Sequence, residues 1–322
     1  SLRPLSCTTP RSAAAFADFN GDSRLDIAIA NRGSADVTVL LQNANGAFSS
    51  VTLLKVAPDP VAIVAVDLNV DGARDIATAS FGTGDITVGL GDARGGFTTG
   101  TAISGRPSTE TLSAVDVTGD SQPDLIATSA GASTLAIFVN AGSAAFTTSG
   151  THRVGSQPIS LQVGDVDRNG TPDVVTSNYA AASISVLRYR SPAGFLASAQ
   201  FDSGGSNPLS TAMADFDGDG ALDIALAHFG AGTVSLLRGD GNGLFGAPVA
   251  IISGLVQPRA IVAARLNADA LPDLVVAVED SDEAIAYVNA LGTFRRGGAA
   301  RVGGSTFALA AGDLNGDGLI DI

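Results

Sequence analysis

The chain has 322 residues, a formal net charge of −14 at pH 7 and a hydrophobic content of 45%. This negative charge opposes contact with a phosphate backbone, so we expect no nucleic-acid partner. No apolar run reaches the roughly 20 residues that span a bilayer, so we expect no membrane insertion. Cys7 is the only cysteine, which excludes an internal disulfide and leaves the redox compartment open.

In chain order, the sequence predicts short strands separated by turns. After one strand-like piece in residues 1–10, each unit starts with a strand of small residues that enters an acidic loop. A buried strand, a polar turn, a second strand such as 37–41 or 234–237, a phenylalanine-closed turn and a less regular strand follow. The buried strands are expected at 27–30, 76–79, 125–128, 174–176, 224–227 and 274–277. No long window shows helical periodicity, so the predicted fold class is all-β.

The acidic loop occurs seven times at intervals of 48 to 50 residues. The copies are 18–26, 67–75, 116–124, 165–173, 215–223, 265–273 and 313–321. Four strands in a repeat of this length are typical of a propeller blade. We therefore predict a single domain over residues 1–322, a seven-bladed β-propeller of four-stranded antiparallel blades. The last blade is predicted to be incomplete or closed by the N-terminal strand, and a neighbouring chain could also complete it.

The acidic loops have the composition of a calcium site. Loop 215–223 reads Asp-Phe-Asp-Gly-Asp-Gly-Ala-Leu-Asp, with carboxylates at positions 1, 3, 5 and 9. Calcium takes roughly six to eight oxygen ligands, and a carbonyl at position 7 would add one to each loop. Hydrogen-bonded Asx turns are the alternative explanation. The predicted ligands in five loops are Asp18, Asn20, Asp22, Arg24, Asp26, Asp67, Asn69, Asp71, Ala73, Asp75, Asp165, Asp167, Asn169, Thr171, Asp173, Asp215, Asp217, Asp219, Ala221, Asp223, Asp313, Asn315, Asp317, Leu319 and Asp321.

Two loops depart from this pattern. The third has Thr118 and Ser121 where the others have a ligand and usually a glycine, so we expect weak binding or none. In the sixth loop Arg265 replaces the first carboxylate. We expect its guanidinium to pair with Asp269 and Asp273 in place of an ion. The cofactor prediction is thus calcium at about five sites.

These loops, together with Phe245-Gly246 in segment 244–248, resemble the FG-GAP/VCBS repeat family, which includes the propeller of integrin alpha chains. The resemblance covers essentially residues 11–322. It implies a seven-bladed propeller with calcium in the turn between the first two strands of each blade. It does not imply one function, since members include adhesion receptors, lectins and modules attached to enzymes.

Catalysis has little support in the sequence. His152 and His228 are the only histidines, and nearly every aspartate belongs to a loop. A two-carboxylate hydrolase stays open, but an enzyme is the less favoured interpretation.

Turns that differ between repeats are candidates for recognition. We expect them on the face opposite the acidic loops, with ligand contacts from Arg32, Phe81, Tyr179, His228 and Phe229. The favoured interpretation is a secreted or cell-surface, calcium-stabilised binding or adhesion module that recognises a glycan or an extracellular protein. The absence of tryptophan weakens the lectin interpretation. The alternatives are a propeller domain of a secreted enzyme and a structural subunit of an extracellular assembly.

Overall fold

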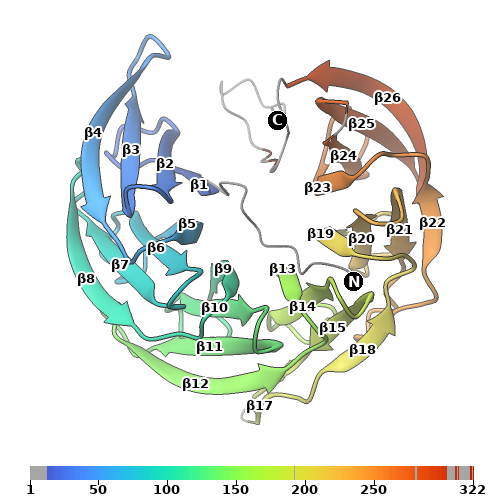
Figure 1. The fold of residues 1–322 in the computed structure, drawn as a ribbon, viewed down its shortest axis with the longest axis horizontal. Coiled ribbons are helices and arrows are strands. Elements are labelled where there is room, and N and C mark those ends of the chain that lie inside the picture. Colours follow the sequence, from blue (N-terminus) through green and yellow to red (C-terminus); the bar gives the residue numbers. More distant parts are fainter. Residues whose placement is uncertain are drawn as a thin grey trace, which may run out of the picture. The chain divides into compact units, whose positions relative to one another are not determined.

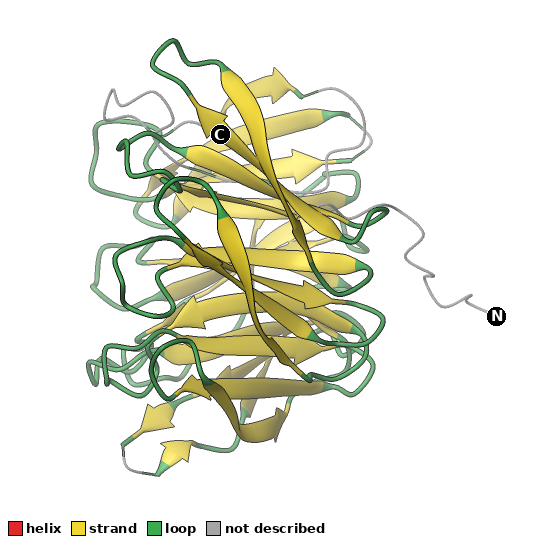
Figure 2. Ribbon diagram, turned by 90° about the vertical axis from the view of Figure 1, so that its left-hand side faces the viewer, coloured by secondary structure: helices red, strands yellow, loops and turns green. Residues whose placement is uncertain are grey.

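The computed structural model describes residues 13–191, 193–279, 281–302, 309, 311, 320 and 322. Its regular structure in these ranges is β-strand throughout, as Figure 2 shows. No helix in this part of the chain could cross a membrane. The all-β prediction is confirmed.

The chain forms two compact units. Of the described residues, the first unit holds those up to Leu112 together with Asn140–Thr147. It contains two antiparallel sheets, ordered β1-β2-β3-β4 and β5-β6-β7-β8 (Figure 1). Their strands are β1 (Ala13–Ala17), β2 (Asp26–Asn31), β3 (Asp36–Gln42), β4 (Phe48–Lys55), β5 (Pro60–Val66), β6 (Asp75–Ser80), β7 (Ile86–Gly91) and β8 (Phe97–Ile103).

The boundary between the units runs through a third sheet, ordered β12-β11-β10-β9. Its strands are β9 (Thr109–Val115), β10 (Asp124–Ser129), β11 (Thr134–Asn140) and β12 (Phe146–Arg153).

The second unit holds Ser113–Val139 and the described residues from Thr148 onward. Its four-stranded sheets are ordered β13-β14-β15-β18, β19-β20-β21-β22 and β23-β24-β25-β26, and β16-β17 is a separate hairpin. The strands are β13 (Pro158–Gly164), β14 (Asp173–Asn178), β15 (Ser183–Leu187), β16 (Tyr189–Arg190), β17 (Gly194–Phe195), β18 (Ala199–Asp202), β19 (Pro208–Ala214), β20 (Asp223–His228), β21 (Thr233–Leu237), β22 (Val249–Ile252), β23 (Pro258–Ala264), β24 (Asp273–Val278), β25 (Glu283–Ala290) and β26 (Thr293–Arg301).

The described residues thus form six four-stranded antiparallel sheets, consistent with a β-propeller. The predicted four-strand repeat is confirmed for them, and each predicted buried strand is the second strand of its sheet. The seventh acidic loop and the N-terminal strand proposed to close the last blade lie outside the described residues.

The second strand of each sheet is the most buried one because apolar sheets cover both of its faces. In β20 and β24 all six residues are buried. Phe216, Ala225 and Val234 of one sheet pack in one cluster with Val276 and Ile285 of the next. The core therefore lies between consecutive sheets, as stacking repeats require.

A buried aspartate is the first residue of every second strand. These residues are Asp26, Asp75, Asp124, Asp173, Asp223 and Asp273, each no more than 1% exposed. In the fifth loop, Oδ2 of the aspartate at 223 accepts the N–H of Phe216 at 3.1 Å and Oδ1 accepts the N–H of Gly239 at 2.9 Å. One carboxylate thereby joins the acidic loop, the second strand and the segment after the third strand.

The acidic loops are also tied to the next sheet. The carbonyl oxygen at loop position 2 accepts a hydrogen bond from the end of the third strand of the following sheet or from the turn after that strand. The four pairs are Gly95 N to Phe19 O (3.0 Å), Asn140 Nδ2 to Leu68 O (2.7 Å), Gly243 N to Val166 O (3.0 Å) and Asn289 Nδ2 to Phe216 O (2.8 Å). Order in one loop is therefore coupled to the packing of its neighbour.

At the other end of the second strand a buried polar pair links that strand to the third. In one sheet, Asn178 Nδ2 donates to Ser185 Oγ at 2.9 Å. In the following sheet, the equivalent pair is His228 and Ser235, with His228 Nε2 2.8 Å from Ser235 Oγ. Ser235 Oγ donates its only hydrogen to Ser203 O at 2.6 Å, so we assign the Nε2–H tautomer to His228. Nδ1 of this buried ring makes no hydrogen bond within the described part of the chain.

The loop aspartates that begin the second strands should be structural even where no cation is expected. In the sixth loop, Asp273 accepts the N–H groups of Leu266 at 3.0 Å and Asn289 at 2.8 Å. The substitution Asp273→Asn turns an amide group toward one of these donors. We expect it to lower the free energy of unfolding by about 2 kcal/mol, measured by urea denaturation in excess chelator.

Asp269→Asn in the same loop is the control for this prediction. Asp269 is exposed, and an asparagine oxygen can still accept the N–H of Leu271. We expect its effect to stay within about 0.5 kcal/mol. Equal effects of the two substitutions would contradict the structural role of Asp273.

His228 should make the fold sensitive to acid. Its burial lowers the pKa of the ring to about 4. In the unfolded chain the histidine pKa is near 6.5, so between about pH 4 and pH 6.5 the unfolded chain binds more protons than the folded chain. The contribution of His228 to stability is therefore full above about pH 6.5 and is lost as the pH decreases toward 4.

The substitution His228→Asn copies the Asn178–Ser185 pair of the preceding sheet. We expect it to reduce the loss of melting temperature between pH 7 and pH 4.5 relative to the wild type. His152→Asn, on β12, is the control. An unchanged acid response of the His228 variant would show that this histidine is not the sensitive group.

Candidate metal centres

The acidic loops share one backbone arrangement around the carboxylate at position 1. In the fifth loop, Asp215 Oδ1 accepts the N–H of Gly218 at 2.7 Å and Oδ2 accepts the N–H of Gly220 at 2.8 Å. Among the described loops with an aspartate at position 1, position 6 always has a left-handed backbone, with φ of 84° at Gly220 and 66° at Ser23. A serine at this position therefore keeps the loop conformation at the cost of some backbone strain.

Three carboxylates converge in the fourth and fifth loops. One oxygen each of Asp165, Asp167 and Asp173 lie within 4.8 Å of one another, and the same holds for Asp215, Asp217 and Asp223. No other group of three such side chains converges so closely in the described residues. Position 3 explains the difference, because it is an aspartate in these two loops, an asparagine in the first two and a threonine in the third.

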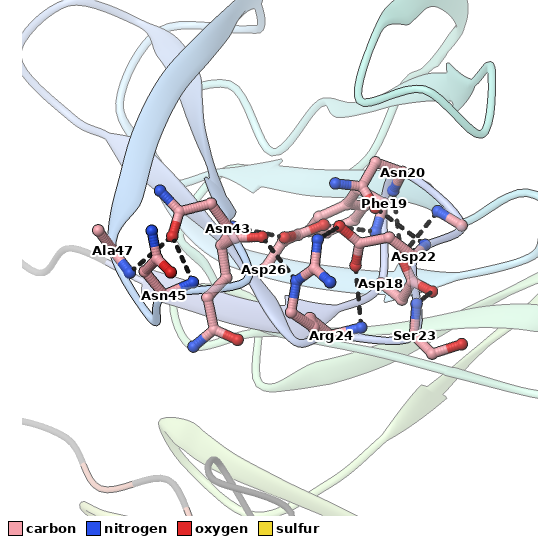
Figure 3. Close-up of polar contacts among 12 residues, drawn as sticks. Asp18, Phe19, Asn20, Asp22, Ser23, Arg24, Asp26, Asn43, Asn45 and Ala47 are labelled. Atoms are coloured by element: carbon pink, nitrogen blue, oxygen red, sulfur yellow. Dashed lines mark hydrogen bonds and ion pairs between the residues drawn. The ribbon is translucent and has the colours of Figure 1, made fainter.

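The first two loops combine carboxylates with amide oxygens. Asp18 accepts four backbone N–H groups, from Asn20 at 3.2 Å to Ser23 at 2.7 Å (Figure 3). Burial opposes ionisation, but these bonds together lower the pKa of Asp18. Asp22 pairs with the guanidinium of Arg24.

In the second loop, Asp67 Oδ2 accepts the N–H of Gly72 at 2.8 Å, and Asn69 Nδ2 donates to Asp71 Oδ2 at 2.8 Å. The latter bond leaves Asn69 Oδ1 facing the N–H of Asp71 at 3.0 Å. The fifth-position side chains are held from within each loop. They accept the N–H groups of the position 7 residues Arg24, Ala73, Thr171 and Ala221.

The converging carboxylates are electrostatically strained in the absence of a cation. Burial raises the pKa of Asp173 to about 6, against hydrogen bonds from Tyr189 and Val166, and the charges of Asp167 and Asp165 add to the rise. Burial likewise raises the pKa of Asp223 to about 6. Burial also raises the pKa of Asp75. A nearby positive charge would reverse these shifts.

The residues of the fourth loop fit a hard cation. The Asp167 side chain is 1% exposed, and neither of its oxygens accepts a hydrogen bond. Arg190 Nη2 stands 2.6 Å from Asp167 Oδ2 as an ion pair, without hydrogen-bond alignment. A donor set made only of oxygens matches calcium or magnesium and does not match zinc.

The fourth loop is open to solvent. A recess of about 470 Å³ lies between β9 and β13, and Asp165, Gly170 and Thr171 are among its lining residues. A cation therefore has an entry path to this loop.

The sixth loop does not use its arginine as predicted. Arg265 is exposed and makes no ion pair with Asp269 or Asp273. Instead, Asn267 Nδ2 donates to Asp273 Oδ2 at 3.2 Å. The prediction of an internal guanidinium was wrong because the side chain at position 1 points to solvent in this loop.

In the third loop, Asp116 is hydrogen-bonded to Gly119 and Ser121 as in the other loops. The seventh-loop residues Asp313, Asn315, Asp317, Leu319 and Asp321 lie outside the described part of the chain.

The predicted ligand residues fall into two arginine–phenylalanine clusters. In the first unit, Arg32 pairs with Asp59, and its guanidinium lies 6.0 Å from the Phe81 ring centroid. In the second unit, Arg259 pairs with Glu279 at 2.6 Å and lies 5.2 Å from the Phe229 ring centroid.

Tyr179 belongs to the second cluster. Burial raises the pKa of Tyr179, and the charge of Arg259 opposes the rise. Asn207 Nδ2 donates to the Tyr179 carbonyl at 3.5 Å, which links two neighbouring sheets. Arg259 and Glu279 are not among the five predicted ligand contacts, although the sequence already places both in turns of this face that differ between repeats. Their common signal is an acidic residue 20 positions after an arginine that follows a turn proline.

His228 does not belong to this surface. Its side chain is 0% exposed, because the Ser203–Gly205 segment covers it. The prediction that it contacts a ligand is therefore corrected, since the second strand ends in the core while Phe229 lies one residue further out.

Strained turns carry this second set of residues. Asp59, Gln157, Asn207 and Gln257 precede prolines with left-handed φ values of 64°, 55°, 55° and 52°. Their carbonyl oxygens accept the N–H groups of Phe81, Tyr179, Phe229 and Glu279. Such strain persists only where the surroundings fix it, and it is common at functional sites.

Comparison with solved structures supports the fold. The chain is similar to a lectin from Agrocybe aegerita described as recognising non-reducing terminal N-acetylglucosamine, with 18% identity, a TM-score of 0.60, and coverage of 91% of this chain and 80% of the lectin. It is similar to BBS1N in its complex with ARL6DN, with 13% identity, a TM-score of 0.67, and coverage of 93% and 84%. A protein from Lactobacillus plantarum is 13% identical with a TM-score of 0.69, and coverage is 92% and 86%. At these identities the likeness shows the fold alone.

No curated protein sequence matches the chain. The sequence profile of the FG-GAP-like repeat, in contrast, matches residues 18–78, 116–176, 215–276 and 265–322. Each match begins at the first residue of an acidic loop, namely the first, third, fifth and sixth loops. Together the matches cover more than half of the chain. The chain therefore belongs to the FG-GAP-like repeat family.

Proposed function

We propose that this chain is a calcium-stabilised, seven-bladed β-propeller of one domain that acts outside the cell or at its surface as a binding module. It would recognise a glycan or an extracellular protein through the turns at the opposite end of the sheets from the acidic loops. The observation that carries this proposal is the Asp165, Asp167 and Asp173 set, in which a buried carboxylate accepts no hydrogen bond.

Calcium at these loops would have a structural role. The aspartates at positions 1 and 9 already hold the loop backbone, and position 9 also joins the loop to β16, which follows the third strand. A bound dication would neutralise the remaining repulsion among the three carboxylates. Because the loop carbonyl at position 2 is bonded to the next sheet, such neutralisation would stabilise the contact between sheets as well.

The recognition surface is supported by side-chain chemistry. Tyr179, Phe229, Arg259 and Glu279 bring half-buried rings, a cation and a carboxylate together on neighbouring sheets of the second unit. The repeat framework below them is constant, whereas these turns differ from one repeat to the next. A lectin and a subunit of a protein complex share the fold, so we propose both a glycan and a protein as ligand classes to be tested.

Calcium removal tests the metal part of the proposal. We expect excess chelator at pH 7.5 to lower the melting temperature, and added calcium to restore it. The stabilisation should shrink below about pH 6, because protons compete for the carboxylates of Asp173 and Asp223 whose pKa values burial has raised. Between about pH 6 and 4 the metal-free protein gains stability by protonation, so the two melting curves converge.

Metal counting separates a specific site from general acidity. We expect Asp217→Asn to bind one calcium fewer than the wild type by equilibrium dialysis, since it removes a converging carboxylate. Asp269→Asn should leave the count unchanged. Equal counts for all three proteins, or a melt that chelator does not change, would contradict structural calcium.

A binding screen tests the recognition part. The calcium-loaded protein is applied to a glycan array and, in parallel, to a panel of purified extracellular matrix proteins. We expect a ligand whose binding is lost in Tyr179→Ala and Phe229→Ala. Leu291→Ala, at an exposed turn on the acidic-loop end of its sheet, is the control. Binding that survives both aromatic substitutions, or no binding by folded protein, would contradict this surface.

A further inference from the structure

Arg190 is held at the edge of the fourth acidic loop by its backbone. It forms β16 with Tyr189, and it pairs with Gly194 in the β16-β17 hairpin. The N–H of Tyr189 donates to Asp173 Oδ1 at 2.8 Å, and Asn169 Nδ2 donates to the Tyr189 carbonyl at 3.1 Å. The residue next to Arg190 is thus bonded to positions 5 and 9 of the loop.

The side chain of Arg190 reaches the buried carboxylate of this loop. Its Nη2 lies 2.6 Å from Asp167 Oδ2. The Asp167 side chain is 1% exposed, but that of Arg190 is 39% exposed. The guanidinium can therefore leave for solvent without breaking the core, whereas Asp167 cannot leave the loop.

The fifth loop, which is the other loop with three converging carboxylates, shows a weaker version of this contact. In the fifth loop, Arg238 Nε is 3.4 Å from Asp217 Oδ2, and Arg238 is 57% exposed. In the second loop, no described arginine forms an ion pair with Asp67, Asp71 or Asp75. The closest guanidinium contact to a converging carboxylate is therefore at the fourth loop.

We propose that Arg190 is an internal counterion of loop 165–173, which neutralises Asp167 in the metal-free protein and is displaced when a divalent cation binds. This inference rests on the proposed cation binding at that loop. It adds that Arg190 sets the affinity, so that the fourth loop binds its cation more weakly than it would without the arginine.

The physical reason is competition for one carboxylate. Three converging carboxylates without a positive charge would repel one another, the more so where burial lowers the local dielectric constant. The guanidinium offsets part of this repulsion in the metal-free state. A dication offsets more of it, but it must first displace the guanidinium and then bind near a like charge. Arg190 thus stabilises the metal-free loop and opposes the metal-bound one.

Terbium(III) luminescence can report on this loop alone. Terbium is a calcium mimic that emits when a nearby tyrosine is excited, and the chain has no tryptophan and three tyrosines. Tyr189 is bonded to the fourth loop through its backbone, so it should sensitise an ion bound there. The signal that Tyr189→Phe removes defines the fourth-loop component. Titration of that component with terbium, and its displacement with calcium, gives the affinity.

We expect Arg190→Met to bind terbium about tenfold more tightly than the wild type, because one like charge is removed from beside the ion. Arg190→Lys keeps the charge and should remain close to wild type. Arg188→Met is the matched control. Arg188 is two residues earlier and donates to the Asn242 carbonyl at 3.0 Å, so its loss should change the affinity by at most about twofold. In chelator, Arg190→Met should have a lower melting temperature than the wild type.

The outcomes separate this inference from the calcium proposal. A tighter Arg190→Met variant with a lower metal-free melting temperature supports the counterion role. Equal affinities with a lower melting temperature would reduce Arg190 to a structural residue and overturn the inference while leaving cation binding in place. An equal gain in Arg188→Met would assign the effect to net charge and also overturn it. The absence of any Tyr189-dependent signal in the wild type and in all variants would overturn both proposals.

Discussion

The buried aspartate at the start of each second strand is the interaction on which the rest of the structure depends. Its two oxygens accept N–H groups from the acidic loop and from the end of the third strand or the residues just after it, as at Asp273 and Asp223. A buried carboxylate is costly unless it is hydrogen-bonded, and these bonds satisfy it with backbone that must itself be satisfied. The loop is therefore held in place whether or not a cation is present.

This framework explains why the first five loops share one backbone arrangement although their side chains differ. Among the expected ligand and glycine positions, 1, 3, 5 and 6 vary while 9 is always aspartate, and each loop balances its remaining charge in its own way. Arg190 faces Asp167 in the fourth loop, Asn69 donates to Asp71 in the second, and Asn267 donates to Asp273 in the sixth. A cation, a guanidinium and an amide are thus alternative partners for the same carboxylates. The loops with converging carboxylates have the strongest electrostatic reason to bind an ion.

The opposite end of the sheets follows a different rule. There the backbone is left-handed at Asp59, Gln157, Asn207 and Gln257, each just before a turn proline, and the side chains beyond these turns differ between repeats. Arg259 pairs with Glu279 and contacts the Phe229 ring of the neighbouring sheet, so contacts within the chain organise this surface. A preorganised surface on a rigid framework loses less entropy on binding. The same fold can therefore serve different ligands by changing these turns alone.

The sequence by itself determined the repeat, the strands and the aspartate positions, because a period of 48 to 50 residues and alternating turn signals are local features. It also indicated the loop ligands, since their spacing within nine residues sets which oxygens can face one ion. Only the tertiary structure decided which residues meet across longer separations. Arg190 reaches Asp167 through a hairpin, His228 is covered by a segment 23 to 25 residues earlier, and Arg265 points to solvent. The physical reason is that a long side chain can adopt many directions, and packing against other segments selects one of them.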